Sequence, residues 1–134
     1  MDKTIHSVIT ESFGMSPVEI NTGRCYNWAW IASKILDAKL CTIRELYGHA
    51  FILKNNKFYD AEAPNGVDNW WELPYFQNNF GTDEACREGK LRITQEHAFV
   101  RYWSENGAYG MYPKVLRKTL KELTRKIVSE TETC

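Results

Sequence analysis

The clearest pattern along the chain is a helical spacing of apolar side chains over residues 25–40. These positions recur at steps of three and four residues: Cys25, Trp28, Ala29, Ala32, Ile35 and Leu36. Such a stripe forms the face that an amphipathic helix packs against a core. The pattern therefore predicts a helix with Cys25 in its first turn, and Asn21 and Thr22 are expected to cap it.

Similar patterns predict helices toward both ends of the chain, separated by Pro and Gly residues. Gly14 and Pro17 are expected to break the first helix and start a loop. Near the other end, Thr94 is a suitable N-cap and Pro113 a suitable first-turn residue. We expect helices over residues 2–13, 94–106 and 112–130, with a loop over residues 15–24.

Between these helices the sequence consists of short runs of apolar and β-branched residues, which are typical of strands. We expect strands over residues 40–46, 49–54, 57–62 and 90–93. Asn55 and Asn56 stand where a tight hairpin turn is expected, because Asn tolerates positive φ. Residues 64–89 hold Pro and Gly and predict a long loop with one helical turn at residues 68–73. The whole chain, 1–134, is expected to form a single α+β domain. In it, a small antiparallel sheet packs against the Cys-bearing helix, with additional helices at both ends.

Composition narrows the classes of function. The chain has 134 residues, with 17 basic and 17 acidic side chains, so the formal net charge is zero. This balance argues against nucleic acid as the main partner. No apolar run approaches the roughly 20 residues of a membrane span, and residues 1–14 lack the apolar core of a signal peptide. We therefore expect a cytoplasmic protein that does not engage a membrane.

The four cysteines also limit the chemistry. Their spacing contains no Cys-x-x-Cys pair, which argues against a metal site, and no cofactor motif is found. In a reducing compartment they are expected to be free thiols. Cys41 and Cys86 have no partners nearby in the sequence and are expected to be structural.

The expected hairpin brings a histidine and a carboxylate together. If residues 55–56 form a two-residue turn, His49 lies opposite Glu62 and diagonally across from Asp60. Diagonal neighbours in an antiparallel pair lie about 7–8 Å apart, within reach of their side chains. Asp60 is thus the expected hydrogen-bond partner of His49, and Glu62 is the competing one. His97 shares the triplet His-Ala-Phe with His49, but it falls in an expected helix and at the surface.

A thiol becomes a nucleophile as the thiolate, which a helix N-terminus and a nearby imidazole both favour. Gly23, Cys25 and Ala29, followed by His49 and Asp60, resemble the core of the papain-like and transglutaminase-like cysteine enzymes. The resemblance covers residues 22–62 and includes the triplet that begins at His49. It implies an α+β fold with the cysteine helix on an antiparallel sheet. It further implies Cys25 as nucleophile, His49 as general base and acid, and Asp60 as the residue that orients His49.

The resemblance is incomplete upstream of the cysteine. Papain-like enzymes place a glutamine there, and this chain has Glu19 in that stretch instead. The backbone N–H of Cys25 is one natural donor to an oxyanion, and the side chain of Asn21 or Asn27 is another.

These features predict a small cysteine hydrolase (a peptidase, amidase or deamidase) that forms an acyl-enzyme with a protein, peptide or amide substrate. No metal or cofactor is expected to take part. Asn21, Trp70 and Trp71 are the expected substrate-binding residues, because the aromatic loop follows Asp60 directly. Two alternatives stay open. One is an acyltransferase or transglutaminase with the same triad, and the other is a catalytically inert protein-binding module on the same fold.

Overall fold

A computed structural model describes residues 5–46, 48–81, 86, 88–105, 121–122 and 124–125. The described elements, in chain order, are α1 (Ile5–Ser12), α2 (Pro17–Gly23), α3 (Cys25–Leu36), β1 (Lys39–Ile43), β2 (His49–Lys54), β3 (Lys57–Tyr59), the 3-10 helix η1 (Trp70–Glu72), α4 (Pro74–Phe80), β4 (Arg92–Thr94) and α6 (Glu96–Glu105). The chain is thus α+β, as predicted. The helix expected over residues 112–130 lies mostly outside the described residues, although 121–122 and 124–125 are helical.

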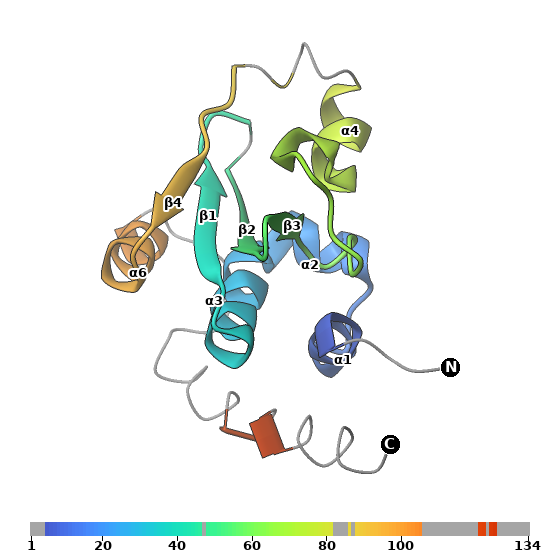
Figure 1. The fold of residues 1–134 in the computed structure, drawn as a ribbon, viewed down its shortest axis with the longest axis vertical. Coiled ribbons are helices and arrows are strands. Elements are labelled where there is room, and N and C mark those ends of the chain that lie inside the picture. Colours follow the sequence, from blue (N-terminus) through green and yellow to red (C-terminus); the bar gives the residue numbers. More distant parts are fainter. Residues whose placement is uncertain are drawn as a thin grey trace.

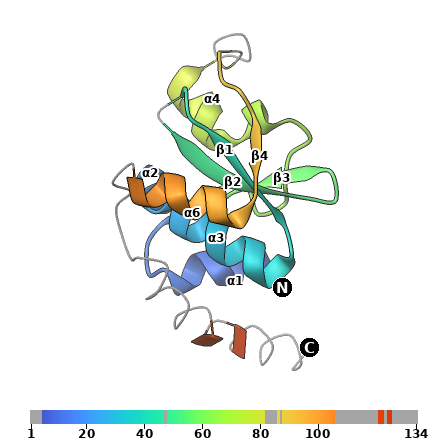
Figure 2. The ribbon, with the colours of Figure 1, turned by 90° about the vertical axis from the view of Figure 1, so that its left-hand side faces the viewer.

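The four strands form one antiparallel sheet in the order β3-β2-β1-β4 (Figure 1). Helices α1, α3 and α6 lie on one side of this sheet, and α4 lies on the other (Figure 2). Each face carries its own hydrophobic cluster, because successive side chains of a strand point to opposite faces. Ala50 and Ile52 of β2 join the cluster under α3, whereas Phe51 joins the cluster under α4. The central strands are therefore covered on both sides, as their apolar sequences predicted.

The hairpin between β2 and β3 has the predicted turn. Asn55 and Asn56 adopt φ values of 51° and 65°, and Lys54 pairs with Lys57. The ladder ends at Tyr59, so β3 is shorter than the strand expected over residues 57–62. Asp60 is therefore not in the sheet: its carbonyl accepts a hydrogen bond from the Ala63 N–H (3.1 Å), which closes a turn.

Two of the expected loops contain helices. Ser16 caps α2 through a capping box with Glu19, and Pro17 occupies the first turn. Likewise, Pro74 begins α4, and Gly81 with φ 80° ends it. The prediction of loops was wrong here because proline was taken to break a helix, whereas in the first turn it favours one.

The C-terminal half of the sheet differs in detail from the prediction. Thr94 is the last residue of β4 rather than a helix cap, and α6 begins at Glu96. Among the described residues, no helix is both long enough and apolar enough to cross a membrane.

Candidate active site

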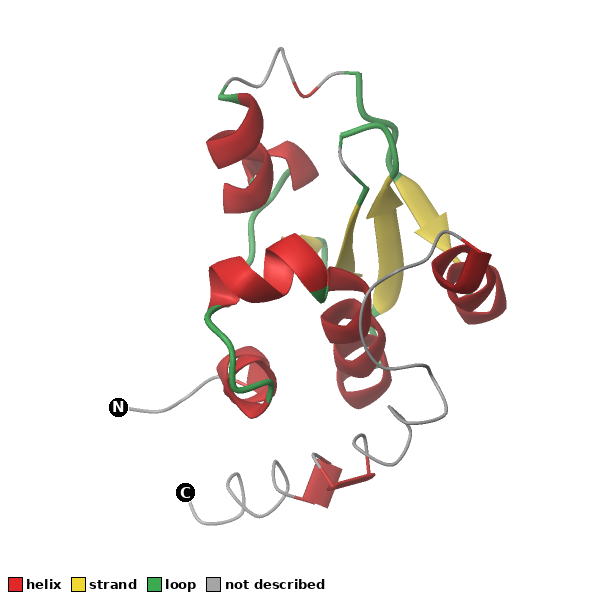
Figure 3. Cartoon of the chain, turned by 180° about the vertical axis from the view of Figure 1, so that it is seen from behind, coloured by secondary structure: helices red, strands yellow, loops and turns green. Residues whose placement is uncertain are grey.

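The cysteine helix begins with almost no loop before it. Arg24 is the single residue between α2 and α3. The view from behind shows α2 running into α3 with hardly any loop between the two helices (Figure 3). Its N–H donates to the Ile20 carbonyl (2.7 Å), and its carbonyl accepts from the Trp28 N–H (3.0 Å). Cys25 is therefore the first residue of α3, as predicted, and is held there by the helix on either side. The caps expected at Asn21 and Thr22 were wrong, because both residues lie inside α2 and Arg24 occupies the cap position without a side-chain hydrogen bond.

His49 is the first residue of β2 and is completely buried. Its Nε2–H donates to Oδ2 of Asp60 at 2.9 Å. The ring stacks on Tyr75 of α4, with centroids 4.0 Å apart, and Phe76 packs edge-on at 5.4 Å. The hydrogen bond and the stacked ring together fix the orientation of the imidazole.

Asp60 uses both carboxylate oxygens and is 1% exposed. One oxygen accepts from His49, and the other, Oδ1, accepts from the backbone N–H of Glu62 at 3.0 Å. The Glu62 side chain points elsewhere: its Oε2 accepts from Nδ2 of Asn21 at 2.7 Å. The register allowed either carboxylate to reach His49, and the structure places Asp60 there. Glu62 instead links the loop after Asp60 to α2 through its hydrogen bond with Asn21.

The electrostatic surroundings favour a charged imidazole. Burial alone would lower the pKa of His49. The larger combined effect comes from the hydrogen bond to Asp60, the polar contact with Cys25 and the negative charges of both groups, which together raise the pKa to about 9. The second ring nitrogen, Nδ1, has no partner at hydrogen-bond geometry among the described residues. Catalytic hydrogen bonds are often long before a substrate binds. Of the three residues, Cys25 has the largest exposed fraction, 9%.

The two tryptophans expected to bind substrate occupy different surroundings. Trp70 lies in the cluster under α4, is 8% exposed and packs against Phe76 at 5.0 Å. Trp71 is partly exposed and meets Trp70 edge-on. Trp70 is therefore a core residue, and Trp71 presents the more accessible ring. Their contact with a substrate stays a prediction.

The other cysteines and histidines have surroundings unlike those of the candidate site. Cys41 and Cys86 are fully buried in the cluster under α4, and burial raises the pKa of the Cys41 thiol to about 12. His97 is exposed in the first turn of α6. His6 stacks on Tyr59, and burial followed by the charge of Lys54 lowers its pKa.

Tyr75 is the site residue that the sequence interpretation missed. It contacts the imidazole directly, but it lay in a segment expected to be a loop. The signal was present, because Pro74 at one end and Gly81 at the other mark a short helix.

The groups expected from the sequence to donate hydrogen bonds to an oxyanion have different surroundings in the structure. Nδ2 of Asn21 donates to Glu62, and Asn27 is 1% exposed inside α3. Glu19 is exposed and caps α2. The first N–H groups of a helix lack intrahelical acceptors, and in α3 these groups start at Cys25. The backbone at Cys25 is therefore the donor nearest to the thiol.

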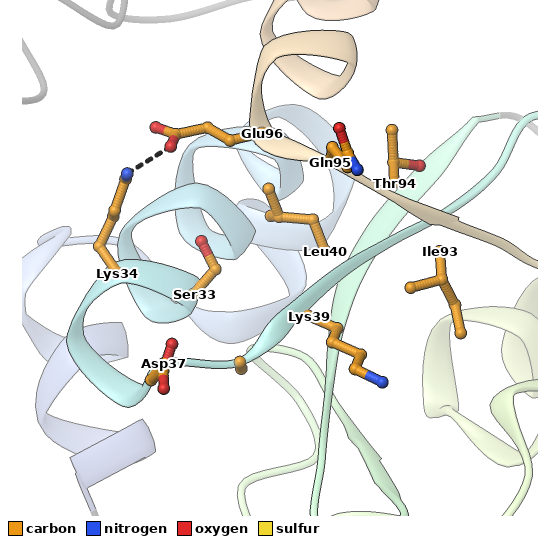
Figure 4. Close-up of a pocket in the computed structure, with 10 residues that line it drawn as sticks. Ser33, Lys34, Asp37, Lys39, Leu40, Ile93, Thr94, Gln95 and Glu96 are labelled. Carbon is orange, nitrogen blue, oxygen red and sulfur yellow. Dashed lines mark hydrogen bonds and ion pairs between the residues drawn. The ribbon is translucent and has the colours of Figure 1, made fainter.

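Described residues line at least two cavities. One, of about 430 Å³, lies where the end of α3 meets β4 and the start of α6, with Lys34 and Glu96 forming an ion pair beside it (Figure 4). It is at the opposite end of α3 from Cys25. A second, of about 570 Å³, lies among α1, α2 and the loop that follows Asp60.

The part of the chain that the structure describes contains no group of three His, Cys, Asp or Glu side chains that could hold a metal ion. No protein-family model, curated protein or solved structure matches the chain.

Proposed function

We propose that the protein is a small cysteine hydrolase with a papain-like or transglutaminase-like core, acting on an amide bond of a protein, peptide or small amide. The observation that carries this proposal is the buried hydrogen bond between His49 and Asp60, 2.9 Å long, beside the thiol that begins α3. A thiol, an imidazole and an orienting carboxylate are the groups that acyl transfer through a cysteine requires.

In the reactive form, His49 carries two ring protons and Cys25 is a thiolate. The sulfur attacks the substrate carbonyl, and the N–H groups at the start of α3 stabilise the negative oxygen that develops. His49 then gives the Nδ1 proton to the leaving nitrogen as the C–N bond breaks, which leaves an acyl-enzyme. Water, deprotonated by the neutral His49, attacks the thioester and releases the acid and the thiolate. Asp60 stays ionised and holds Nε2–H throughout.

An acyltransferase would use the same residues, with an amine in place of water in the second half of the reaction. Hydrolysis is preferred because water needs no second binding site. A reducing compartment such as the cytoplasm suits the proposal, because Cys25, Cys41 and Cys86 are all free thiols.

The test is the rate at which each cysteine of the folded protein reacts with iodoacetamide, followed by mass spectrometry at several pH values. We expect Cys25 to react faster than Cys41 and Cys86, and His49→Asn to slow it by about tenfold or more, because the imidazolium favours the thiolate. The matched control is His97→Asn, in the second His-Ala-Phe triplet, which should leave the rate unchanged. Equal rates at all three cysteines would rule out an activated thiol.

One observation favours a second candidate, the inert binding module. Cys25 is only 9% exposed and His49 is fully buried, so little of the candidate site is open to a substrate. If Cys25 resists iodoacetamide in the folded protein but reacts after unfolding in urea, the site is closed and the binding module is the better description.

A further inference from the structure

The cavity beside the candidate site has a consistent chemical character. We call it the α1–α2 cavity, and it is bounded by α1, the start of α2, the loop after Asp60 and the start of α4. Its main lining residues are Glu11, Met15, Val18, Glu62, Pro64 and Pro74. Its volume, about 570 Å³, falls within the range of small-ligand sites.

The lining combines apolar walls with carboxylates. Met15, Val18 and the prolines supply aliphatic surface, and Val18 is 57% exposed. Glu11 and Glu62 contribute carboxylates, and no described Lys, Arg or His lines the cavity. Such a lining suits a ligand with an aliphatic stem and a cationic end.

The cavity shares a wall with the candidate site. Glu62 lines it and also donates its backbone N–H to Oδ1 of Asp60 (3.0 Å). The Glu62 side chain accepts from Asn21, on the helix that leads into Cys25. One carboxylate offers about four lone-pair positions, so the hydrogen bond to Asn21 leaves acceptor capacity for a ligand.

We propose that the α1–α2 cavity binds the side chain of a lysine or arginine in the substrate peptide. The proposal rests on the proposed hydrolase function, because it treats the cavity as a specificity pocket of the same site. The methylene groups of the bound side chain lie against Met15 and Val18, and its cation lies against the carboxylate of Glu62. Acidic side chains are excluded by the charge of that carboxylate.

The test uses binding alone, so that it does not depend on catalysis. Cys25→Ala protein is titrated with Nα-acetyl-lysine methylamide, which keeps the side-chain ammonium group, and with its neutral analogue Nα-acetyl-norleucine methylamide. The backbone amide chemical shifts are followed by NMR. We expect the lysine compound to bind about threefold tighter or more, as suits a partly exposed ion pair. The shifts should centre on Val18 and Glu62.

Glu62→Gln should remove most of that preference, because it removes the charge that the cation meets and keeps the backbone N–H from which Asp60 accepts. The matched control is Asp37→Asn, which removes a carboxylate from the other cavity at a position where φ is 53° and Asn is equally tolerated. This control should keep the full preference for lysine.

The outcomes separate the two proposals. Equal binding of lysine and norleucine, or shifts centred on the Asp37 cavity, would overturn the specificity pocket whatever the reactivity of Cys25. Selective lysine binding together with an unreactive Cys25 would keep the pocket and reject the hydrolase.

Discussion

Replacing Asp60 with Asn tests the electrostatic basis of the candidate site. Asp60 accepts hydrogen bonds on both oxygens, from His49 and from the Glu62 N–H, and it is nearly inaccessible to water. Asn has one accepting oxygen and carries no charge, so one of the two hydrogen bonds must be lost. The shape of the side chain is almost unchanged, which confines the perturbation to charge and hydrogen bonding.

The size of the effect follows from the pKa of His49. This pKa is raised from 6.5 to about 9. Each pKa unit corresponds to about 1.4 kcal/mol, so the charged ring contributes about 3 kcal/mol to the free energy of unfolding. Because the folded pKa lies above the unfolded one, this contribution is complete below pH 6.5 and is lost as the pH rises through about 9. Asp60→Asn replaces the charged acceptor that raises this pKa most with a neutral one, so we expect a loss of about 2 kcal/mol near pH 6.

The assay is urea unfolding of both proteins near pH 6 and near pH 10, combined with NMR titration of the histidine rings. The difference between the proteins should shrink to about 1 kcal/mol at the higher pH, where the ring is neutral in both. In the variant, the NMR pKa of His49 should fall. Asp68→Asn is the control, because Asp68 pairs with Lys57 at the surface of the same hairpin and its loss should change stability little at either pH.

Two results would refute this reasoning. If Asp60→Asn costs the same free energy at both pH values, the contribution is not that of a charged imidazole. If the His49 ring titrates below 6.5 in the unmodified protein, burial lowers its pKa by more than Asp60 and Cys25 raise it. An ion pair between the Cys25 thiolate and the His49 imidazolium is then no longer expected.

Three further substitutions test the surroundings of the site through urea unfolding. Trp70→Ala should cost about 3–5 kcal/mol, as expected for a core aromatic residue; a loss below about 1 kcal/mol would place Trp70 outside the core. Gly89→Ala should cost about 1–3 kcal/mol, because a Cβ there would lie 2.8 Å from Ile43 and 2.9 Å from Trp70; an unchanged midpoint would contradict that packing. Ser16→Ala should cost about 1 kcal/mol by removing the capping box with Glu19. Ser104→Ala on α6 serves as its control, because that exposed hydroxyl donates to the Val100 carbonyl of its own helix.

The parts of the fold that could be predicted depend on local patterns. The apolar spacing that starts at Cys25 identifies α3, and the turn at Asn55 and Asn56 fixes the register of β2 and β3. From that register the contact between His49 and Asp60 could be anticipated, even though Asp60 proved to lie just past the strand. A two-residue turn determines pairing over several residues, which is why this long inference succeeded.

Of the parts that were missed, two helices carry local signals, whereas the contacts that they make depend on tertiary packing. Helix α2 could have been found from its capping box, since Ser16 and Glu19 have the required spacing around Pro17. Helix α4 has no side-chain cap, and its aromatic residues are fixed by burial in the cluster under it. Its contact with His49 through Tyr75 depends on that tertiary packing. The same holds for the hydrogen bond between Asn21 and Glu62, which joins residues 41 positions apart.

The close spacing of His49 and Asp60 along the chain has a consequence for folding. The two residues are 11 positions apart, and Asp60 directly follows the hairpin that begins at His49, so bringing them together closes only a short loop. Cys25 joins them only when α3 docks on the sheet, which requires contacts between more distant segments and is therefore slower. A nascent or partly folded chain can hold the imidazole against its carboxylate while the thiol is still apart from both. Cys25 therefore meets His49 and Asp60 only when the fold is complete.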